Sequence, residues 1–91
     1  MRRLRAGIRA HHRYHWHAYH RPHGWYYRHW SYGQFLPRGW WTRNYWITDW
    51  GTFGLLAPPT GYVWVRVGPD AMLIDIYTGE IVRAVYGLFY F

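Results

Sequence analysis

The chain lacks cysteine and lysine altogether, and only four of its 91 residues are acidic. The absence of cysteine excludes a disulfide framework, a thiolate metal site and a cysteine nucleophile. The residues after position 30 also contain no histidine that could act as a base. We assign each carboxylate a structural role: a helix cap for Asp49, a turn for Asp70, and a solvent-facing position for Asp75 and Glu80. The sequence therefore predicts that the protein is not an enzyme.

Long hydrophobic runs are also missing. The longest, "AVYGLFYF" at residues 84–91, is far too short to cross a bilayer core of about 30 Å, so we expect no membrane span. The basic start "MRRLRAGIRA" is not followed by the apolar run that a signal peptide needs, so we expect no export signal in this chain. The last residues, 87–91, fit either a segment that caps the fold or an exposed patch for self-association, and the oligomeric state stays open.

Positive charge is concentrated at one end. Residues 1–30 hold seven arginines and no acid, whereas residues 31–91 hold four arginines and four acids, so the net charge of +7 lies wholly in the first third. All seven histidines lie there too. Residues 1–33 contain few aliphatic side chains and show no clear helical or alternating period. We therefore predict a disordered or irregular, flexible arm over residues 1–33 and one small β domain over residues 34–91.

Alternation of residue type predicts strands in the second half. Three such segments follow one another: "YVWVRV" (62–67), "AMLIDI" (71–76) and "EIVRAVY" (80–86). In the first of them the three valines lie on one face, whereas Tyr62, Trp64 and Arg66 lie on the other. "YWIT" (45–48) is a candidate for a fourth strand because β-branched and aromatic residues cluster there.

Turn signals connect these segments. "GPD" (68–70) and "YTG" (77–79) are typical of hairpin turns, with Gly79 in a left-handed conformation. A single helical turn is predicted from Asp49 to Phe53, ending at Gly54. The predicted fold class is α+β, mainly β: a small antiparallel meander of three to four strands with one short helical turn, preceded by the irregular arm.

Several short motifs of the second half occur in a fixed order. They are Leu36-Pro37, "TDW" (48–50), Gly54-Leu55, Pro58-Pro59, "GYVWVRVG" (61–68), Asp70, "LIDI" (73–76) and "TGEI" (78–81). In this order, residues 34–86 resemble the RcnB family, small periplasmic proteins associated with nickel and cobalt homeostasis. The resemblance implies a small folded domain, a periplasmic location and a connection with these two metals. The matching motifs contain no evident ligand set, and the arm lies outside them.

Six histidines fall within "HHRYHWHAYHRPH", residues 11–23. Neutral imidazole binds Ni²⁺ and Co²⁺, and also Zn²⁺ and Cu²⁺, and several histidines on one flexible segment can converge on one ion. The spacing matches no zinc-finger pattern, so we predict weak, exchangeable binding of Ni²⁺ or Co²⁺ and no tightly bound cofactor. The predicted ligand pool is His11, His12, His15, His17, His20 and His23.

The same arm supports a second interpretation, as a basic tether. Arginines interleaved with tyrosine and tryptophan offer phosphate contacts and stacking faces, so the arm could hold the domain on an anionic envelope surface, lipopolysaccharide, lipid or nucleic acid. No nucleic-acid-binding signature is present, which disfavours the last of these. The residues concerned are Arg2, Arg3, Arg5, Arg9, Arg13, Arg21 and Arg28. A third alternative, a compositionally biased segment without a function of its own, also stays open.

Overall fold

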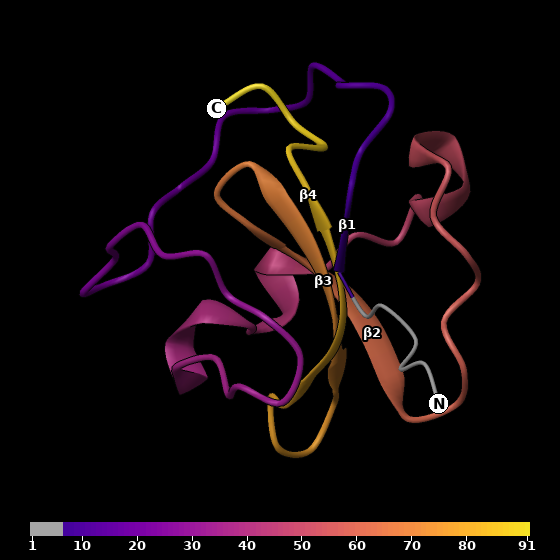
Figure 1. The fold of residues 1–91 in the computed structure, drawn as a ribbon. Helices are drawn as coiled ribbons and strands as arrows, with labels where there is room; N and C mark the ends of the chain where they lie inside the picture. The colour runs from indigo at the N-terminus through magenta and orange to yellow at the C-terminus, as the bar shows by residue number, and fades with distance from the viewer. Residues whose placement is uncertain (1–6) are drawn as a thin grey trace, which may run out of the picture.

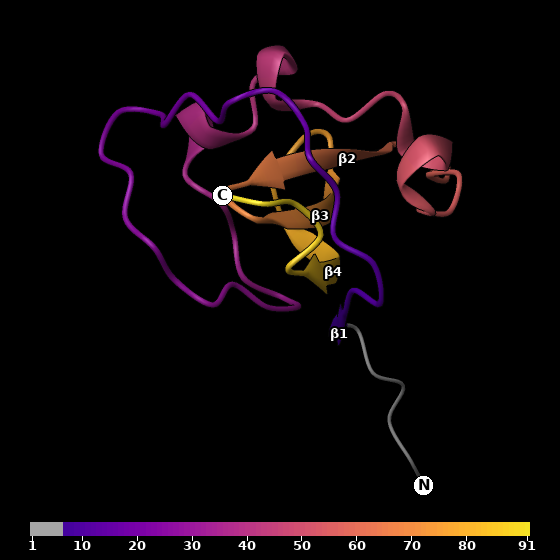
Figure 2. The ribbon, with the colours of Figure 1, turned by 90° about the horizontal axis from the view of Figure 1, so that it is seen from above.

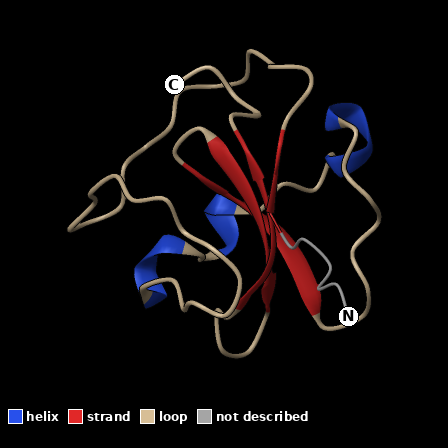
Figure 3. Ribbon diagram, in the orientation of Figure 1, coloured by secondary structure: helices blue, strands red, loops and turns tan. Residues whose placement is uncertain are grey.

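A computed structural model describes residues 7–91 and has a four-stranded sheet at its centre (Figure 1, Figure 2). The strands are β1 (Gly7–Arg9), β2 (Tyr62–Val67), β3 (Asp70–Asp75) and β4 (Ile81–Tyr86), in the order β1-β4-β3-β2. The helical segments are three short 3-10 helices, η1 (Arg38–Trp40), η2 (Arg43–Tyr45) and η3 (Trp50–Phe53) (Figure 3). The prediction of a small, mainly β domain is confirmed. Over residues 7–91, however, the helical content consists of 3-10 turns only.

The three predicted strands of the second half are present. β2 pairs with β3, and β3 with β4, in antiparallel orientation, as the alternation of side chains predicted. The wholly antiparallel meander is wrong, because β1 lies beside β4 in parallel orientation, with Gly7 opposite Ala84 and Arg9 opposite Tyr86. The sheet is therefore mixed, and its fourth strand comes from the start of the chain.

Residues 45–48 do not form the predicted fourth strand. They make one isolated bridge, Trp46 opposite Val65, and the Ile47 amide donates to the Trp64 carbonyl at 2.8 Å. η2 ends just before this stretch and η3 begins just after it, so too few extended residues remain to build a ladder. The apolar side chain of Ile47 is nevertheless buried against the sheet.

The predicted helical turn is η3. Asp49 occupies the N-cap position, but its side chain makes no capping hydrogen bond, so the predicted capping role is wrong. Gly54 ends the turn with a φ of 72°, and the Leu55 amide donates to the Trp50 carbonyl at 2.9 Å. This ending matches the prediction, and it buries Leu55 under the turn.

A β-bulge in β4 decides which of its side chains face the same way. Leu73 lies opposite Arg83, whereas Ile74 lies opposite Ile81, so one extra residue of β4 has no partner at this point. The extra residue moves the alternation of the strand by one position. As a result Ile81 and Ala84, three positions apart, both belong to one core cluster.

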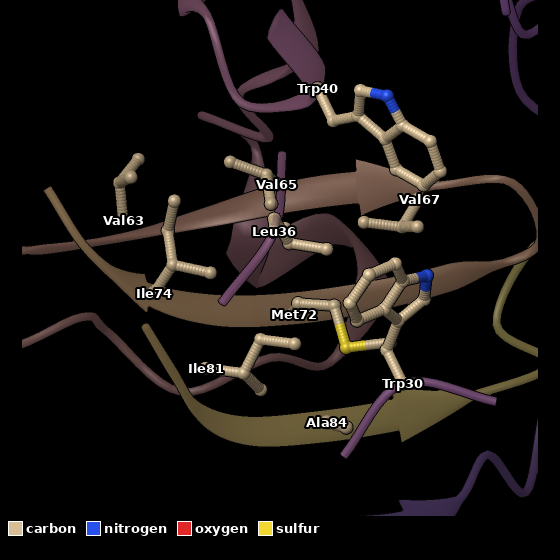
Figure 4. Packing of buried hydrophobic residues seen from close by; sticks show 10 residues of the cluster. All are labelled: Trp30, Leu36, Trp40, Val63, Val65, Val67, Met72, Ile74, Ile81 and Ala84. Atoms are coloured by element: carbon tan, nitrogen blue, oxygen red, sulfur yellow. The ribbon is translucent and has the colours of Figure 1, made fainter. Parts of the chain in front are cut away.

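One face of the sheet carries a core of strand aliphatics and tryptophans (Figure 4). Its buried members are Trp30, Leu36, Trp40, Val63, Val65, Val67, Met72, Ile74, Ile81 and Ala84. The indole rings of Trp30 and Trp40 meet edge to face, with centroids 5.7 Å apart. Each large aromatic ring buries about 150–250 Å², which lets a sheet with few aliphatic residues fill its core.

The opposite face of the sheet is buried as well. Its core consists of Ile47, Phe53, Leu55, Trp64, Ala71, Leu73, Val85, Leu88 and Phe89. η3 supplies Phe53 to this second core, whereas η1 supplies Trp40 to the first. Trp64 is only 1% exposed, so the alternating positions of β2 are buried on both sides of the sheet. The sheet is therefore the middle layer of the molecule.

The described part of the first third, residues 7–33, winds around the sheet mostly without regular structure (Figure 2). Gly7 allows the Tyr86 ring to lie against β1, because a Cβ there would come within 2.9 Å of Cε2 of that ring. The Tyr86 hydroxyl donates to the Trp30 carbonyl at 2.5 Å, and Trp30 is only 4% exposed. Both ends of this stretch thus contact β4. The division into an arm and a domain at residue 33 stays a prediction.

The last four residues form two pairs that differ in burial. Leu88 and Phe89 are buried in the second core, and the Phe89 amide donates to the Pro69 carbonyl at 2.9 Å. Tyr90 and Phe91, in contrast, are 48% and 59% exposed. Of the two roles predicted for residues 87–91, capping applies to the first pair. Self-association through the second pair stays a prediction.

The hairpin between β3 and β4 depends on Gly79 and Asp75. Gly79 has a φ of 81°, as predicted. Asp75 does more than face solvent: its Oδ1 accepts the amides of Tyr77 at 2.7 Å and Thr78 at 3.2 Å. The side chain therefore satisfies two backbone donors of the turn.

Replacing Gly79 with alanine should lower the free energy of unfolding by at least ~1–2 kcal/mol, the usual cost of a left-handed conformation for a residue with a Cβ. The new Cβ would also lie 2.6 Å from Nε1 of Trp41. Urea unfolding followed by tryptophan fluorescence measures the change. Gly51→Ala is the matched control, since its Cβ meets nothing within 4 Å. Equal effects of the two substitutions would contradict the role given to Gly79.

Candidate functional site

Aromatic residues and histidines alternate along the segment "YHWH" that begins at Tyr14. Tyr14 and Trp16 are partly buried, whereas His15 and His17 are exposed. The Tyr14 and Trp16 rings lie 5.2 and 5.1 Å from the Phe53 ring of η3. An extended chain sends successive side chains to opposite sides. The aromatic side chains therefore hold the segment on the second core and leave the imidazoles in solvent.

Arg66 of β2 connects three parts of the chain. Its side chain is buried, with the residue only 3% exposed. Nε donates to the Gly68 carbonyl at 2.9 Å, Nη1 to the His17 carbonyl at 2.7 Å and Nη2 to the Tyr90 carbonyl at 3.3 Å. One guanidinium thus binds the hairpin turn, the histidine-rich segment and the C-terminal tail, which run close together in Figure 1.

Three aromatic rings surround the Arg66 guanidinium. Its Cζ lies 4.8 Å from the ring centroid of Phe89, 5.3 Å from that of Tyr19 and 5.7 Å from that of Trp16. Such cation–π contacts offset part of the hydration that a buried cation loses. Burial still lowers the pKa of Arg66 below its usual value. A guanidinium nevertheless keeps its charge in proteins, so the positive charge remains at neutral pH.

A cleft of about 110 Å³ opens beside Arg66. It is lined by Trp16, His17, Ala18, Tyr19, His20, Asn44, Tyr45 and Arg66. The Tyr45 hydroxyl donates to the His20 carbonyl at 2.6 Å, which attaches η2 to the histidine-rich segment. Burial raises the pKa of Tyr45 above its usual value. Two histidines of the predicted pool therefore share a cleft with a buried cation.

The hydroxyl of Tyr19 is buried, and its O–H has no acceptor within residues 7–91. Burial raises the pKa of Tyr19 to about 12, although the backbone amide of Gly68 beside the phenol oxygen acts in the opposite direction. The phenol therefore stays protonated at neutral pH and keeps its O–H available as a donor. A buried O–H without an acceptor costs about 1–3 kcal/mol, a cost that an acceptor from solution would remove.

All six histidines of the predicted pool are exposed: His11, His12, His15, His17, His20 and His23. The structure separates them. The pair at positions 17 and 20 lines the cleft beside Arg66, whereas the pair at positions 11 and 12 lines another groove of about 220 Å³. Over residues 7–91, no three side chains of His, Cys, Asp or Glu lie together as a metal site. The assignment of these residues as a shared ligand pool stays a prediction.

The structure describes four of the seven arginines that the basic-tether interpretation names. Arg2, Arg3 and Arg5 lie outside the described residues, and Arg9, Arg13, Arg21 and Arg28 are exposed. The guanidinium carbon of Arg13 lies 5.4 Å from the Tyr90 ring centroid, and that of Arg21 lies 5.5 Å from the Phe91 ring centroid. Both rings are exposed, so charge and stacking faces stand side by side at this surface.

Asp70 is not the turn residue that the sequence predicted. Val67 pairs with Asp70, so the turn consists of Gly68 and Pro69 alone and Asp70 begins β3. The residue is 2% exposed, and its Oδ1 accepts the Gly87 amide at 2.8 Å. Burial raises the pKa of Asp70 above its usual value, while this hydrogen bond and nearby basic side chains act in the opposite direction. Asp70 therefore anchors the end of β4 from inside the fold.

The family model described as "RcnB: Nickel/cobalt transporter regulator" matches residues 33–83, which are 51 of the 91 residues. The chain belongs to the RcnB family. The resemblance drawn from the sequence motifs is thereby confirmed. RcnB is a family of regulators rather than of enzymes. The matched region includes Arg66 and Asp70, whereas the histidines lie before it.

A solved structure resembles this RcnB protein with a TM-score of 0.62 and 25% sequence identity, covering 74% of this chain and 81% of that chain. This share exceeds the 51 residues of the family match, so the common fold includes some residues outside 33–83. No curated protein matches the chain. Among the described residues of the RcnB protein, no helix has the length and apolar character needed to cross a membrane.

Asp70→Asn tests the buried carboxyl. Because the pKa of Asp70 is raised in the folded state, the unfolded chain releases this proton first as pH rises. The wild-type protein should therefore lose free energy of unfolding between the ordinary aspartate pKa of about 3.9 and the raised folded-state value. The loss should be absent in Asp70→Asn. Urea unfolding across this pH window measures the difference, and Glu80→Gln is the control. If the free energy of unfolding depends on pH in the same way in Asp70→Asn and in the wild type, the assignment is contradicted.

Proposed function

We propose that this RcnB protein serves nickel and cobalt homeostasis as a non-enzymatic protein that binds these ions weakly through exposed histidines. The observation that carries the proposal is the alternation of partly buried aromatic and exposed imidazole side chains along residues 14–17. Packing of Tyr14 and Trp16 fixes the backbone, so His15 and His17 remain in contact with solvent. The imidazoles are thereby available to ions without unfolding of the domain.

The chemistry of imidazole suits the proposed metals. Neutral histidine is a ligand for Ni²⁺ and Co²⁺, and also for Zn²⁺ and Cu²⁺, so the arm need not be selective by itself. The described residues bring together fewer than three donors at any place. A complete ligand set therefore requires a rearrangement of residues 11–23, a second molecule or a small ligand from solution. This requirement favours weak, exchangeable binding over a permanent cofactor.

We propose a periplasmic location for this protein, because the family resemblance implies that compartment. The carboxylates do not suggest catalysis: Asp70 is buried against a backbone amide, and Asp75 holds a turn.

A basic tether is the second candidate function. The pairs Arg13 with Tyr90 and Arg21 with Phe91 favour it, because each sets a guanidinium beside an exposed ring. Such pairs offer charge and stacking to an anionic surface. Binding of this kind weakens steeply with salt. Coordination of a metal by histidine depends on salt far less, so the two functions can be separated by one titration.

Substitution of all six pool histidines by asparagine should weaken Ni²⁺ binding at about pH 7.5 by at least tenfold, which corresponds to ~1.4 kcal/mol. The sheet should stay intact, since all six side chains are exposed. Isothermal calorimetry measures the affinity, and His29→Asn, outside the pool, is the control. Binding should also fall at about pH 5.5, where imidazole takes up protons, and should change little with added salt.

Unchanged Ni²⁺ affinity in the sixfold variant would contradict the proposed role of the histidines. Loss of binding in high salt, with no effect of the histidine substitutions, would favour the basic tether instead. Vesicles containing anionic lipid, offered in the same buffers, then measure the tether directly.

A further inference from the structure

The guanidinium of Arg66 has hydrogen-bonding capacity that the protein leaves unused. Arginine carries five N–H groups, and the bonds to Gly68, His17 and Tyr90 occupy three of them. One N–H therefore remains on each of the terminal nitrogens Nη1 and Nη2. All three acceptors are backbone carbonyls. None of the three bonds therefore pairs the positive charge of Arg66 with a carboxylate.

The cleft beside this guanidinium has the character of a receptor for a small anion. Trp16, Tyr45 and Arg66 line it. Tyr19, whose buried O–H has no acceptor within residues 7–91, lines it too. The exposed Asn44 of η2 is a further polar residue of the lining.

We propose that this cleft binds a small carboxylate, with Arg66 as its counter-charge and the Tyr19 hydroxyl as an additional donor. The N–H groups of a guanidinium lie in one plane, a geometry that suits the two oxygens of a carboxylate. Aromatic walls suit the short hydrocarbon part of such an acid. The site exists whether or not the histidines bind metal.

The size of the cleft limits the ligand. A volume of about 110 Å³ lies well below the ~300–1,000 Å³ of pockets that hold drug-sized ligands. Acetate, glycolate and lactate are of this size, whereas nucleotides and lipid headgroups are much larger. The ligand class is therefore a monocarboxylate of two or three carbons.

The test follows Arg66 itself by NMR in metal-free buffer. Acetate and then lactate are titrated into the ¹⁵N-labelled full chain at constant ionic strength, with chloride as the reference anion. The Nε–H signal of Arg66 and the indole signal of Trp16 should shift and saturate together. A dissociation constant in roughly the millimolar range is expected for a ligand of about four to six non-hydrogen atoms. The signals of the surface residues Arg38 and Arg83 should not saturate.

Tyr19→Phe is the decisive variant, because it removes a hydroxyl whose O–H has no acceptor in the described chain. Folding should be unaffected or slightly improved, whereas acetate should bind about threefold to tenfold more weakly through the loss of one hydrogen bond. Tyr27→Phe, at an exposed tyrosine outside the cleft, is the matched control and should bind acetate as the wild type does.

Three results would overturn the proposal. The first is an Arg66 signal that does not move with any acid. The second is an equal, unsaturable shift of all arginine signals, which means an adventitious ion only. The third is acetate affinity that is the same in Tyr19→Phe and wild type. Unchanged Ni²⁺ affinity in the sixfold histidine variant would contradict the proposed function but would leave each of these measurements on the metal-free wild-type chain as it is, so the two proposals fail separately.

Discussion

The hydrogen bonds of the buried Arg66 guanidinium are the contacts on which the arrangement of the histidine-rich segment and the C-terminal tail depends. Removal of a cation from water costs several kcal/mol, and the cost must be offset by bonds and by favourable surroundings. Here three carbonyls and three aromatic rings provide that compensation, and two of the carbonyls belong to His17 and Tyr90. The N-terminal segment and the C-terminal tail are therefore held by the same side chain of β2. Without them the guanidinium would lie on an open sheet face; without the guanidinium, neither segment would have this charged anchor.

The two-sided burial of the sheet gives the surface its character. Because aromatic residues from both ends of the chain cover the second core, the residues that alternate with them point outward, and these are mainly histidine and arginine. Display of imidazoles thus results from packing rather than from a dedicated ligand cage. The same packing leaves a cleft beside Arg66, lined by side chains from the N-terminal segment, η2 and β2. In this RcnB protein, the packing of aromatic residues on the sheet therefore determines both the fold and the positions of the exposed histidines and arginines.

Local patterns in the sequence predict the local parts of the fold and little of the rest. The alternation in residues 62–67 and the left-handed Gly79 are encoded by neighbours in sequence, and both predictions are confirmed. The parallel pairing of β1 and the burial of Arg66 depend on segments far apart in sequence, which no local pattern specifies. "GPD" gives a turn signal, yet the two-residue turn moves Asp70 into the strand and its carboxylate to an amide of Gly87. One short signal was missed in the arm: aromatic and histidine residues alternate from Tyr14 to His17, with the period of an extended segment that has one buried side. For the histidine pool, the sequence predicts which side chains could bind a metal ion. It does not predict whether they lie close enough together to bind one ion, because that depends on the three-dimensional fold.

Amide hydrogen exchange on Arg66→Met tests the central claim most directly. Methionine keeps an apolar side chain of similar length while removing the three donors, so the sheet itself should survive. The amides of Tyr14 and Tyr90, which bond to Leu88 and Tyr14, should lose protection, whereas the paired amides of β2 and β3 should keep theirs. Arg83→Met, at an exposed position of β4, should leave all of them unchanged. Protection of Tyr14 and Tyr90 equal to that of wild type would show that the chain ends are held by apolar packing alone and would contradict the role assigned to Arg66.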